Sequence, residues 1–299
     1  MPSIEALNSQ DAVEGRVEFG PGPGGLTVAE LACPSGRARV ALHGAHVLEY
    51  VPADAKPVLW VSGRSWFEPG KPIRGGIPVC WPWFGPHATG AELPAHGFAR
   101  LEQWQVVAAA GDEQSASIVL ALNDSQETRR LWHCGFALEM RVEIGEKLAV
   151  ALEATNTGNE PFETTAALHS YFAVSDIAGV SIAGLDGCEY IDKMDHAARK
   201  TQRGDVTFSG ETDRVYAGTT ADCVIDDPGM ARRIRIASRG SRSTVVWNPW
   251  TAKAARMEDF GDDEWPGMVC VETANAGDDA VTLAPGASHT LKAIISLEQ

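Results

Sequence analysis

Basic residues are scarce in this 299-residue chain: 25 lysines and arginines stand against 40 aspartates and glutamates, a formal net charge of −15. Nucleic acids and anionic membrane surfaces repel such a chain unless its basic residues are concentrated in a patch. No such patch is visible in the sequence. We therefore expect no nucleic acid and no membrane among its partners, and any anion site must be a local exception built from a few arginines.

The sequence also lacks long apolar runs, a leader-like N-terminus and clustered cysteines. No stretch approaches 18 uninterrupted apolar residues, and the N-terminus has no basic segment followed by an apolar one. The six cysteines are scattered and form no C-x-x-C pair, which argues against zinc; they are Cys33, Cys80, Cys134, Cys188, Cys223 and Cys270. These absences predict a cytoplasmic protein with reduced thiols and no metal.

Helical periodicity is rare, whereas alternation with period two recurs along the chain. Residues 125–132 and 252–258 could each form a turn or two of helix. Residues 136–144 and 148–154 alternate around Gly145-Glu-Lys147 and predict an antiparallel hairpin. Further alternating strands are expected at 38–42, 104–108, 118–122, 232–236 and 289–297, and inner strands at 57–61, 179–183, 243–247 and 268–272. The pattern predicts an all-β protein: a large antiparallel β-sandwich with few short helices.

No linker rich in proline, serine or glycine divides the chain. The nearest candidate, residues 20–25, lies too close to the N-terminus to separate domains and is expected to be a turn. All-β sandwiches of this length commonly form one unit. We therefore predict a single domain over residues 1–299.

The most informative segment is Arg74-Gly-Gly-Ile-Pro-Val-Cys-Trp-Pro-Trp-Phe-Gly-Pro86. Its three prolines forbid a helix and predict an extended, rigid wall. Trp81, Trp83 and Phe84 offer flat apolar faces of the kind that pack against the C–H faces of a sugar. Arg74 borders this uncharged surface, where its attraction for an anion is strengthened. A phosphorylated sugar fits this chemistry, although the aromatic residues could equally seal the end of a β-sheet core.

Several motifs in order resemble those of the glucose-6-phosphate 1-epimerases, or hexose-6-phosphate mutarotases, a branch of the aldose 1-epimerase superfamily. They are Arg74-Gly-Gly-Ile-Pro, Trp81-Pro-Trp-Phe-Gly85, Pro94-Ala-His-Gly-Phe-Ala-Arg100, Ala167-Leu-His-Ser-Tyr-Phe172, Thr212-Asp-Arg-Val-Tyr216, Trp247-Asn-Pro249 and Val269-Cys-Val-Glu-Thr273. The resemblance implies a sandwich of the galactose mutarotase type, with its active site on the concave face of one sheet. It also implies an isomerase that interconverts the α and β anomers of a hexose 6-phosphate, most simply glucose 6-phosphate, without a cofactor.

Mutarotation needs one acid for the ring oxygen and one base for the anomeric hydroxyl. His169 lies in an uncharged stretch where an imidazole can be tuned to transfer protons, but it could also be a buried histidine satisfied by a hydroxyl or a carbonyl. Glu272 has apolar neighbours that would raise its pKa towards that of a useful base, but it could be an edge charge. The resemblance assigns His169 the role of acid and Glu272 that of base.

Five further residues are candidates for binding substrate. The planar guanidinium groups of Arg74 and Arg100 match phosphate oxygens, although structural salt bridges are an alternative for both. By resemblance, His96 hydrogen-bonds sugar oxygens. Asp213 could accept from two hydroxyls or be a turn carboxylate, and Trp247 could close the pocket or be a packed indole. Many relatives have a polar side chain where this chain has Ala95, so one substrate contact is expected to differ.

Two other functions remain open from the sequence. One is a non-catalytic carbohydrate-binding β-sandwich that uses the aromatic wall only for stacking. The other is an aldose 1-epimerase that acts on unphosphorylated sugar. The family resemblance favours a monomer.

Overall fold

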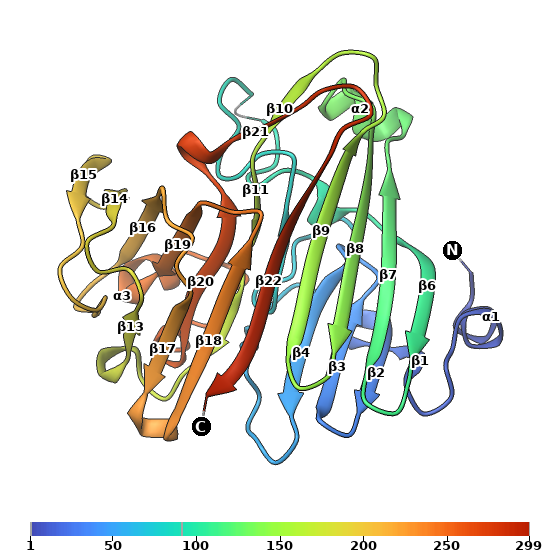
Figure 1. Ribbon diagram of the computed structural model, residues 1–299, viewed down its shortest axis with the longest axis horizontal. Helices are drawn as coiled ribbons and strands as arrows, with labels where there is room; N and C mark the ends of the chain where they lie inside the picture. Colours follow the sequence, from blue (N-terminus) through green and yellow to red (C-terminus); the bar gives the residue numbers. More distant parts are fainter. Residues whose placement is uncertain (1, 91, 299) are drawn as a thin grey trace.

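Two layers of antiparallel β-structure make up the molecule (Figure 1), and the computed structural model describes residues 2–90 and 92–298. The first layer, here named the long sheet, consists in spatial order of β13 (Ser181–Ala183), β17 (Cys223–Asp227), β18 (Arg232–Arg239), β22 (Ser288–Glu298), β9 (Leu148–Asn156), β8 (Phe136–Ile144), β7 (Ala116–Asn123) and β6 (Gln105–Gly111). The strands β22, β9, β8, β7 and β6 stand side by side in Figure 1. The other sheets of the molecule pack on this broad layer.

Two sheets form the second layer. The first consists of β1 (Val17–Pro21), β2 (Thr27–Cys33), β3 (Gly36–Ala41) and β4 (His46–Pro52), and it packs on β7 and β8. The second, here named the site sheet, consists of β15 (Ala198–Thr201), β14 (Glu189–Asp192), β16 (Thr212–Ala217), β19 (Ser243–Asn248), β20 (Met268–Asn275), β11 (Ala166–Leu168) and β5 (Val79–Cys80), with β12 (Tyr171–Ala173) also paired to β20. The strands β11 and β20 pack on β22.

The remaining elements are short. A two-stranded sheet pairs β10 (Phe162–Thr164) with β21 (Val281–Leu283). The helices are α1 (Ile4–Gln10), α2 (Gln126–Leu131) and α3 (Trp250–Ala254), with 3-10 turns at Pro23–Gly25, Ala99–Leu101, Ile177–Gly179, Pro228–Met230, Trp265–Gly267 and Gly277–Asp279. The helix α2 begins where Ser125 and Thr128 each accept a hydrogen bond from the other's backbone N–H, which satisfies two amides at the helix end. None of the helices in residues 2–90 and 92–298 is long and apolar enough to cross a membrane.

The hairpin of β8 and β9 shows why the sequence folds in this way. Phe136, Leu138, Met140, Val142 and Ile144 are all fully buried, while the residues between them are partly or wholly exposed. Side chains alternate across a strand, so this pattern turns one face of β8 into the core. The core continues along the chain from Leu7 to Ile295. That continuity supports a single domain, which stays a prediction.

Most predicted strands are confirmed, but several boundaries are wrong. Residues 57–61 form only isolated bridges to Phe172 and Gly75, because their apolar character reflects burial rather than a ladder of hydrogen bonds. In the segment 179–183 only Ser181–Ala183 is a strand, and β6 begins at Gln105, since Trp104 turns into the core. The helix expected at 252–258 is α3, which ends at Ala254.

Every residue of β20 is buried, because both faces of this central strand are covered. One face packs into the sandwich, and the other carries Cys270, Glu272 and Ala274. The register pairs Glu272 with Val245, and Val245 with Val215; the neighbouring row is Cys270, Trp247 and Asp213. Residues in register on adjacent strands share a face. Residues far apart in sequence thus meet on one surface of the site sheet.

Candidate active site

His169 and Glu272 lie in contact on this face. His169 follows β11, and its backbone N–H donates to the carbonyl of Pro78 at 3.1 Å. Its Nε2 lies 3.4 Å from Oε1 of Glu272, and the two side chains are 9% and 1% exposed. The imidazole stacks on Tyr171, with the ring centroids 4.8 Å apart. Stacking and strand geometry together fix the orientation of the imidazole against the carboxyl group.

The surroundings move the two pKa values in opposite directions. Burial raises the pKa of Glu272 well above its usual value, because a carboxylate loses its hydration there. Burial, followed by the charges of His96, Arg74 and Arg100, lowers the pKa of His169 well below its usual value. Both shifts favour the neutral forms, a protonated carboxyl group on Glu272 and an uncharged imidazole on His169, which together share one acidic proton.

Each member of the pair also has a polar atom that no described residue satisfies. Nδ1 of His169 and Oε2 of Glu272 are buried, and neither has a hydrogen-bond partner among the described residues. Buried polar atoms are nearly always hydrogen-bonded in folded proteins, and exceptions often mark functional sites. These two atoms are therefore positioned to receive groups from a ligand.

His96 and Phe84 border the pair. The His96 ring lies 5.6 Å from that of His169 and 5.0 Å from that of Phe84. Its Nδ1 accepts a hydrogen bond from the backbone N–H of Gly85, so the neutral ring carries its proton on Nε2. Burial, followed by the charges of Arg100 and Arg74, keeps the pKa of His96 well below its usual value. His96 is thus a neutral hydrogen-bond donor next to His169.

The expected aromatic wall is only partly correct. Trp81 is fully buried, and its ring packs against Phe98, Trp132 and Phe136 in the core. Trp83 is also buried, and its indole N–H donates to the carbonyl of Pro94. The alternative, that aromatic residues seal the sheet core, holds for both tryptophans. Phe84 alone of the three rings lies against the histidines, 6.5 Å from His169.

Arg74 is held by two groups that sequence analysis did not identify. Its Nε and Nη2 lie 3.1 and 3.0 Å from Oδ2 of Asp259, and Nη1 donates to the hydroxyl of Tyr171 at 3.0 Å. Asp259 is buried. The structural salt bridge considered for Arg74 therefore exists, and it braces the guanidinium through the tyrosine on which His169 stacks. The signal for Tyr171 in the sequence is its place in the motif Ala167-Leu-His-Ser-Tyr-Phe172, two residues after His169.

Arg100 differs from Arg74 because no carboxylate in residues 2–90 and 92–298 pairs with it. Its Nη2 donates to the carbonyl of Ala95 at 2.7 Å, while its buried Nε has no partner among those residues. Desolvation lowers the pKa of Arg100, and the charge of Arg74 contributes to the shift. A guanidinium with unused donors next to a second guanidinium is suited to a dianion.

Asp213 and Trp247 occupy the row beside Glu272. Asp213 lies within β16 rather than in a turn, and its Oδ1 is 3.3 Å from Nζ of Lys193. The Trp247 ring stands nearly perpendicular to that of His169 at a centroid distance of 6.0 Å. Lys193 is the third group that sequence analysis missed, because nothing in its local sequence relates it to residues on other strands. All seven predicted site residues belong to one region of the site sheet and its adjoining loops.

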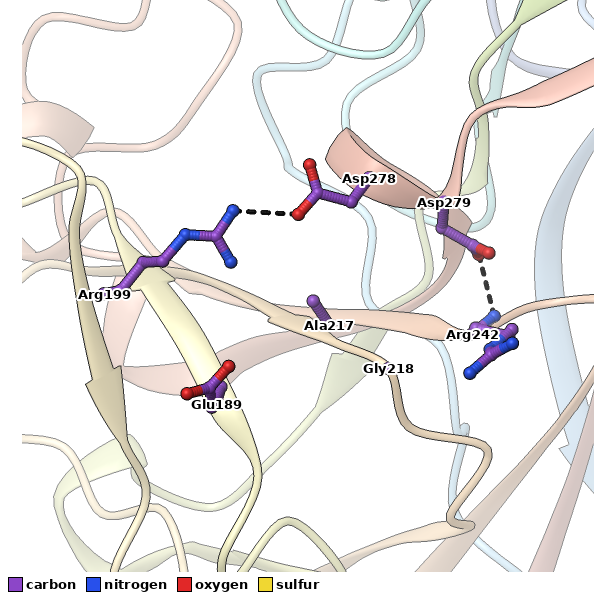
Figure 2. A pocket seen from close by; sticks show the side chains of 7 residues that line it. All are labelled: Glu189, Arg199, Ala217, Gly218, Arg242, Asp278 and Asp279. Carbon is purple, nitrogen blue, oxygen red and sulfur yellow. Dashed lines mark hydrogen bonds and ion pairs between the residues drawn. The ribbon is translucent and has the colours of Figure 1, made fainter.

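No group of three or more His, Cys, Asp or Glu side chains in the described part of the chain could hold a metal ion. The expectation of a reaction without metal or cofactor stays a prediction. A separate pocket of about 420 Å³ is lined by Glu189, Arg199, Ala217, Gly218, Arg242, Asp278 and Asp279 (Figure 2). It shares no residue with the candidate site, and Arg199 in it is already paired with Asp278 at 2.8 Å.

The fold is a large antiparallel β-sandwich whose site sheet carries a buried acid–base pair, and comparison with known proteins gives its class. The aldose 1-epimerase family model matches residues 28–296. The chain belongs to the aldose 1-epimerase family, and it is an epimerase.

Relatives with known sequences or structures match most of the chain. A protein of Escherichia coli (strain K12), provisionally named glucose-6-phosphate 1-epimerase, is 39% identical over 262 residues, 87% of each chain. The crystal structure of a provisionally named mutarotase (YeaD) from Salmonella typhimurium superimposes with a TM-score of 0.90 at 35% identity, covering 97% of this chain and 96% of that one. A galactose mutarotase related enzyme from Lactobacillus acidophilus has a TM-score of 0.73 at 15% identity, covering 91% and 97%. The predicted sandwich of the galactose mutarotase type is confirmed.

Proposed function

We propose that this epimerase interconverts the α and β anomers of a hexose 6-phosphate, with glucose 6-phosphate as the first candidate. The observation that carries the proposal is the contact of His169 with Glu272 at 3.4 Å, beside two guanidinium groups of which one has no carboxylate partner among the described residues. The names of the relatives from Escherichia coli and Salmonella typhimurium support it.

The substrate's phosphate binds between Arg100 and Arg74 in this proposal. Arg100 supplies unused donors, and Arg74 is held in place by Asp259 and Tyr171. The sugar ring then lies over the acid–base pair. His96 donates its Nε2 proton to a sugar oxygen, Asp213 accepts from hydroxyls, and Trp247 borders the ring.

Ring opening requires two proton transfers. Glu272 as base takes the proton of the anomeric hydroxyl, and His169 as acid gives a proton to the ring oxygen while the bond from C1 to that oxygen breaks. The open aldehyde turns about its C1–C2 bond, and the reverse transfers close the ring on the other face. The pair gains one proton and loses one, so it begins and ends with a single shared proton. Two such groups together lower the barrier by roughly 5–10 kcal/mol.

The substrate's phosphate also prepares the acid. The charges of Arg74 and Arg100 help to lower the pKa of His169. A bound phosphate offsets these charges and raises that pKa, so the shared proton moves towards His169 and leaves Glu272 ionised. A neutral sugar lacks this effect. The proposal thus links phosphate recognition to the protonation state that catalysis needs.

The test compares rates of anomer exchange for glucose and glucose 6-phosphate with the wild-type protein and Arg74→Ala. The proposal expects a strong preference for glucose 6-phosphate that Arg74→Ala reduces. A preference for the neutral sugar, unchanged by Arg74→Ala, would establish the aldose 1-epimerase for unphosphorylated sugar instead. Binding without any enzyme-dependent exchange would establish the non-catalytic carbohydrate-binding module.

Other expectations accompany this proposal. The net charge of −15 supports the absence of nucleic acid and of anionic membrane surfaces as partners. A monomer stays a prediction, tested by sedimentation. A cytoplasmic location also stays a prediction, and the substrate class supports it, because a charged sugar phosphate does not cross a bilayer unaided.

A further inference from the structure

Lys193 borders the candidate site near one edge of the site sheet. It follows β14 directly, and its backbone N–H donates to the carbonyl of Asp213 at 2.9 Å. Its Nζ lies 3.3 Å from Oδ1 of Asp213 and 5.3 Å from the centroid of the Phe84 ring. Phe84 in turn lies against His96 and His169. The ammonium group therefore lies on the side of Phe84 and Asp213 where the sugar is proposed to bind.

The charge of Lys193 also acts on the acid–base machinery. It is the leading charge that opposes the rise in the pKa of Glu272, and it contributes to the lowering of the pKa of His96. The titratable or charged groups that act on Glu272 from its own and neighbouring strands and loops are Cys80, His169, Tyr171, Lys193, Asp213 and Cys270. Among these six, Lys193 is the residue whose charge lowers the pKa of Glu272, whereas Asp213 raises it.

We infer that Lys193 is a substrate-binding residue: its ammonium group and the carboxylate of Asp213 together hold two neighbouring hydroxyls of the hexose ring. The inference rests on the proposed function, because it adds a contact to the same bound sugar. An ammonium group has three donors and no acceptor, whereas an ionised carboxylate only accepts. A hydroxyl does both, so two adjacent hydroxyls can bridge the pair.

The exposure of the two side chains suits this role. Lys193 is 41% exposed, and Asp213 is 17% exposed. A pair with one solvated member contributes little to stability, so a structural purpose does not account for it. The lysine can also move aside for an entering sugar at small cost. Once the sugar covers the pair, water is excluded and its hydrogen bonds to the hydroxyls strengthen.

The test measures anomer exchange on glucose 6-phosphate and on its 2-deoxy, 3-deoxy and 4-deoxy analogues. Lys193→Met should raise KM for glucose 6-phosphate roughly tenfold, the scale of one lost charge-assisted hydrogen bond at a partly solvated site. Lys193→Arg should restore part of the loss. The analogue that lacks the hydroxyl bound by Lys193 should already be a poor substrate for the wild type. On that analogue Lys193→Met should cause little further loss of activity, because the contact is already missing.

A pH profile provides a second readout. Loss of the ammonium charge should move the ionisation that depends on Glu272 to higher pH in Lys193→Met. Lys71→Met is the matched control, because Lys71 also pairs with a carboxylate, Glu68 at 3.2 Å, and lies 4.8 Å from an aromatic ring, Trp66. This control should leave KM and the pH profile unchanged.

Equal additional losses of Lys193→Met on all three deoxy analogues, together with an unmoved pH profile, would overturn the inference. An unchanged KM for glucose 6-phosphate would also overturn it. Circular dichroism and thermal denaturation check that Lys193→Met is folded. If it is not folded, KM and the pH profile of Lys193→Arg are compared with those of the wild type instead. Failure of the proposed function gives a different result, since the wild type would then show no enzyme-dependent exchange on hexose 6-phosphate.

Discussion

Arg100→Met separates phosphate recognition from structural support. Methionine retains much of the apolar volume of the arginine side chain but removes every donor. In the substrate-free protein the guanidinium makes one hydrogen bond, to the carbonyl of Ala95, and its buried Nε has no partner among the described residues. A buried unpaired donor costs free energy. We therefore expect the free energy of unfolding to stay within about 1 kcal/mol of the wild-type value or to rise.

Activity should respond much more strongly than stability. A hydrogen bond to a charged group contributes about 1.5–3 kcal/mol, and 1.36 kcal/mol corresponds to a factor of ten in rate. The loss in kcat/KM on glucose 6-phosphate should therefore be about 10- to 150-fold. The residual activity on glucose should change by less than about threefold, because no phosphate contact is lost.

The assay is exchange NMR between the two anomers, read on phosphorus for the phosphorylated sugar and on the anomeric proton for glucose, with thermal denaturation alongside. Arg129→Met, at an exposed arginine of α2 that pairs with Asp124, is the control and should leave both rates unchanged. Equal losses on the two sugars would refute the reasoning, as would a destabilisation of several kcal/mol.

Three further predictions follow from the charges around the pair. Asp259→Asn should raise KM for glucose 6-phosphate about three- to tenfold with little change in kcat, because Arg74 loses its ionic brace; the same change in KM for glucose would contradict this. Activity should follow a bell-shaped pH profile. At low pH it falls when His169 is protonated while Glu272 is also protonated, and this limb lies below the usual pKa of histidine. At high pH it falls when the pair loses its shared proton, and this limb lies above the usual pKa of glutamate. A flat profile between about pH 5 and 9 would count against the pair. Inorganic phosphate should raise the pKa of His169 in a histidine NMR titration, and Arg100→Met should raise it without phosphate; no movement in either case would exclude the proposed link.

The sequence predicts the sandwich because its signals are local. Alternation over 136–144 and 148–154 requires only that one face of each strand be buried, and the structure confirms that hairpin. The apolar run at 57–61 fails as a strand because burial and backbone pairing are different properties, and apolar character reports only the first. Trp81 and Trp83 are misplaced for a related reason: a tryptophan beside prolines suits a core and a sugar face equally well.

Some residues of the candidate site could be predicted from local sequence, and others could not. His169 and Glu272 were identified from motifs, and the sheet brings them together although 103 positions separate them. Asp259 and Lys193 could not be identified, because each acts through a residue that is distant in sequence. The partner of Asp259 is Arg74, 185 residues away, and the partner of Lys193 is Asp213 on another strand. Arg74 and Asp259 lie in loops that the fold brings together, and Lys193 meets Asp213 on the neighbouring strand β16, so neither pairing follows from a local sequence pattern.

The central claim is that His169 and Glu272 transfer protons to and from a bound hexose 6-phosphate. The most direct test is the anomer exchange rate of Glu272→Gln, measured while calorimetry shows that glucose 6-phosphate still binds. The account predicts that the enzyme-dependent rate falls by about 10²- to 10⁴-fold, with the dissociation constant changed by only a few-fold. Undiminished exchange in the glutamine variant would contradict it.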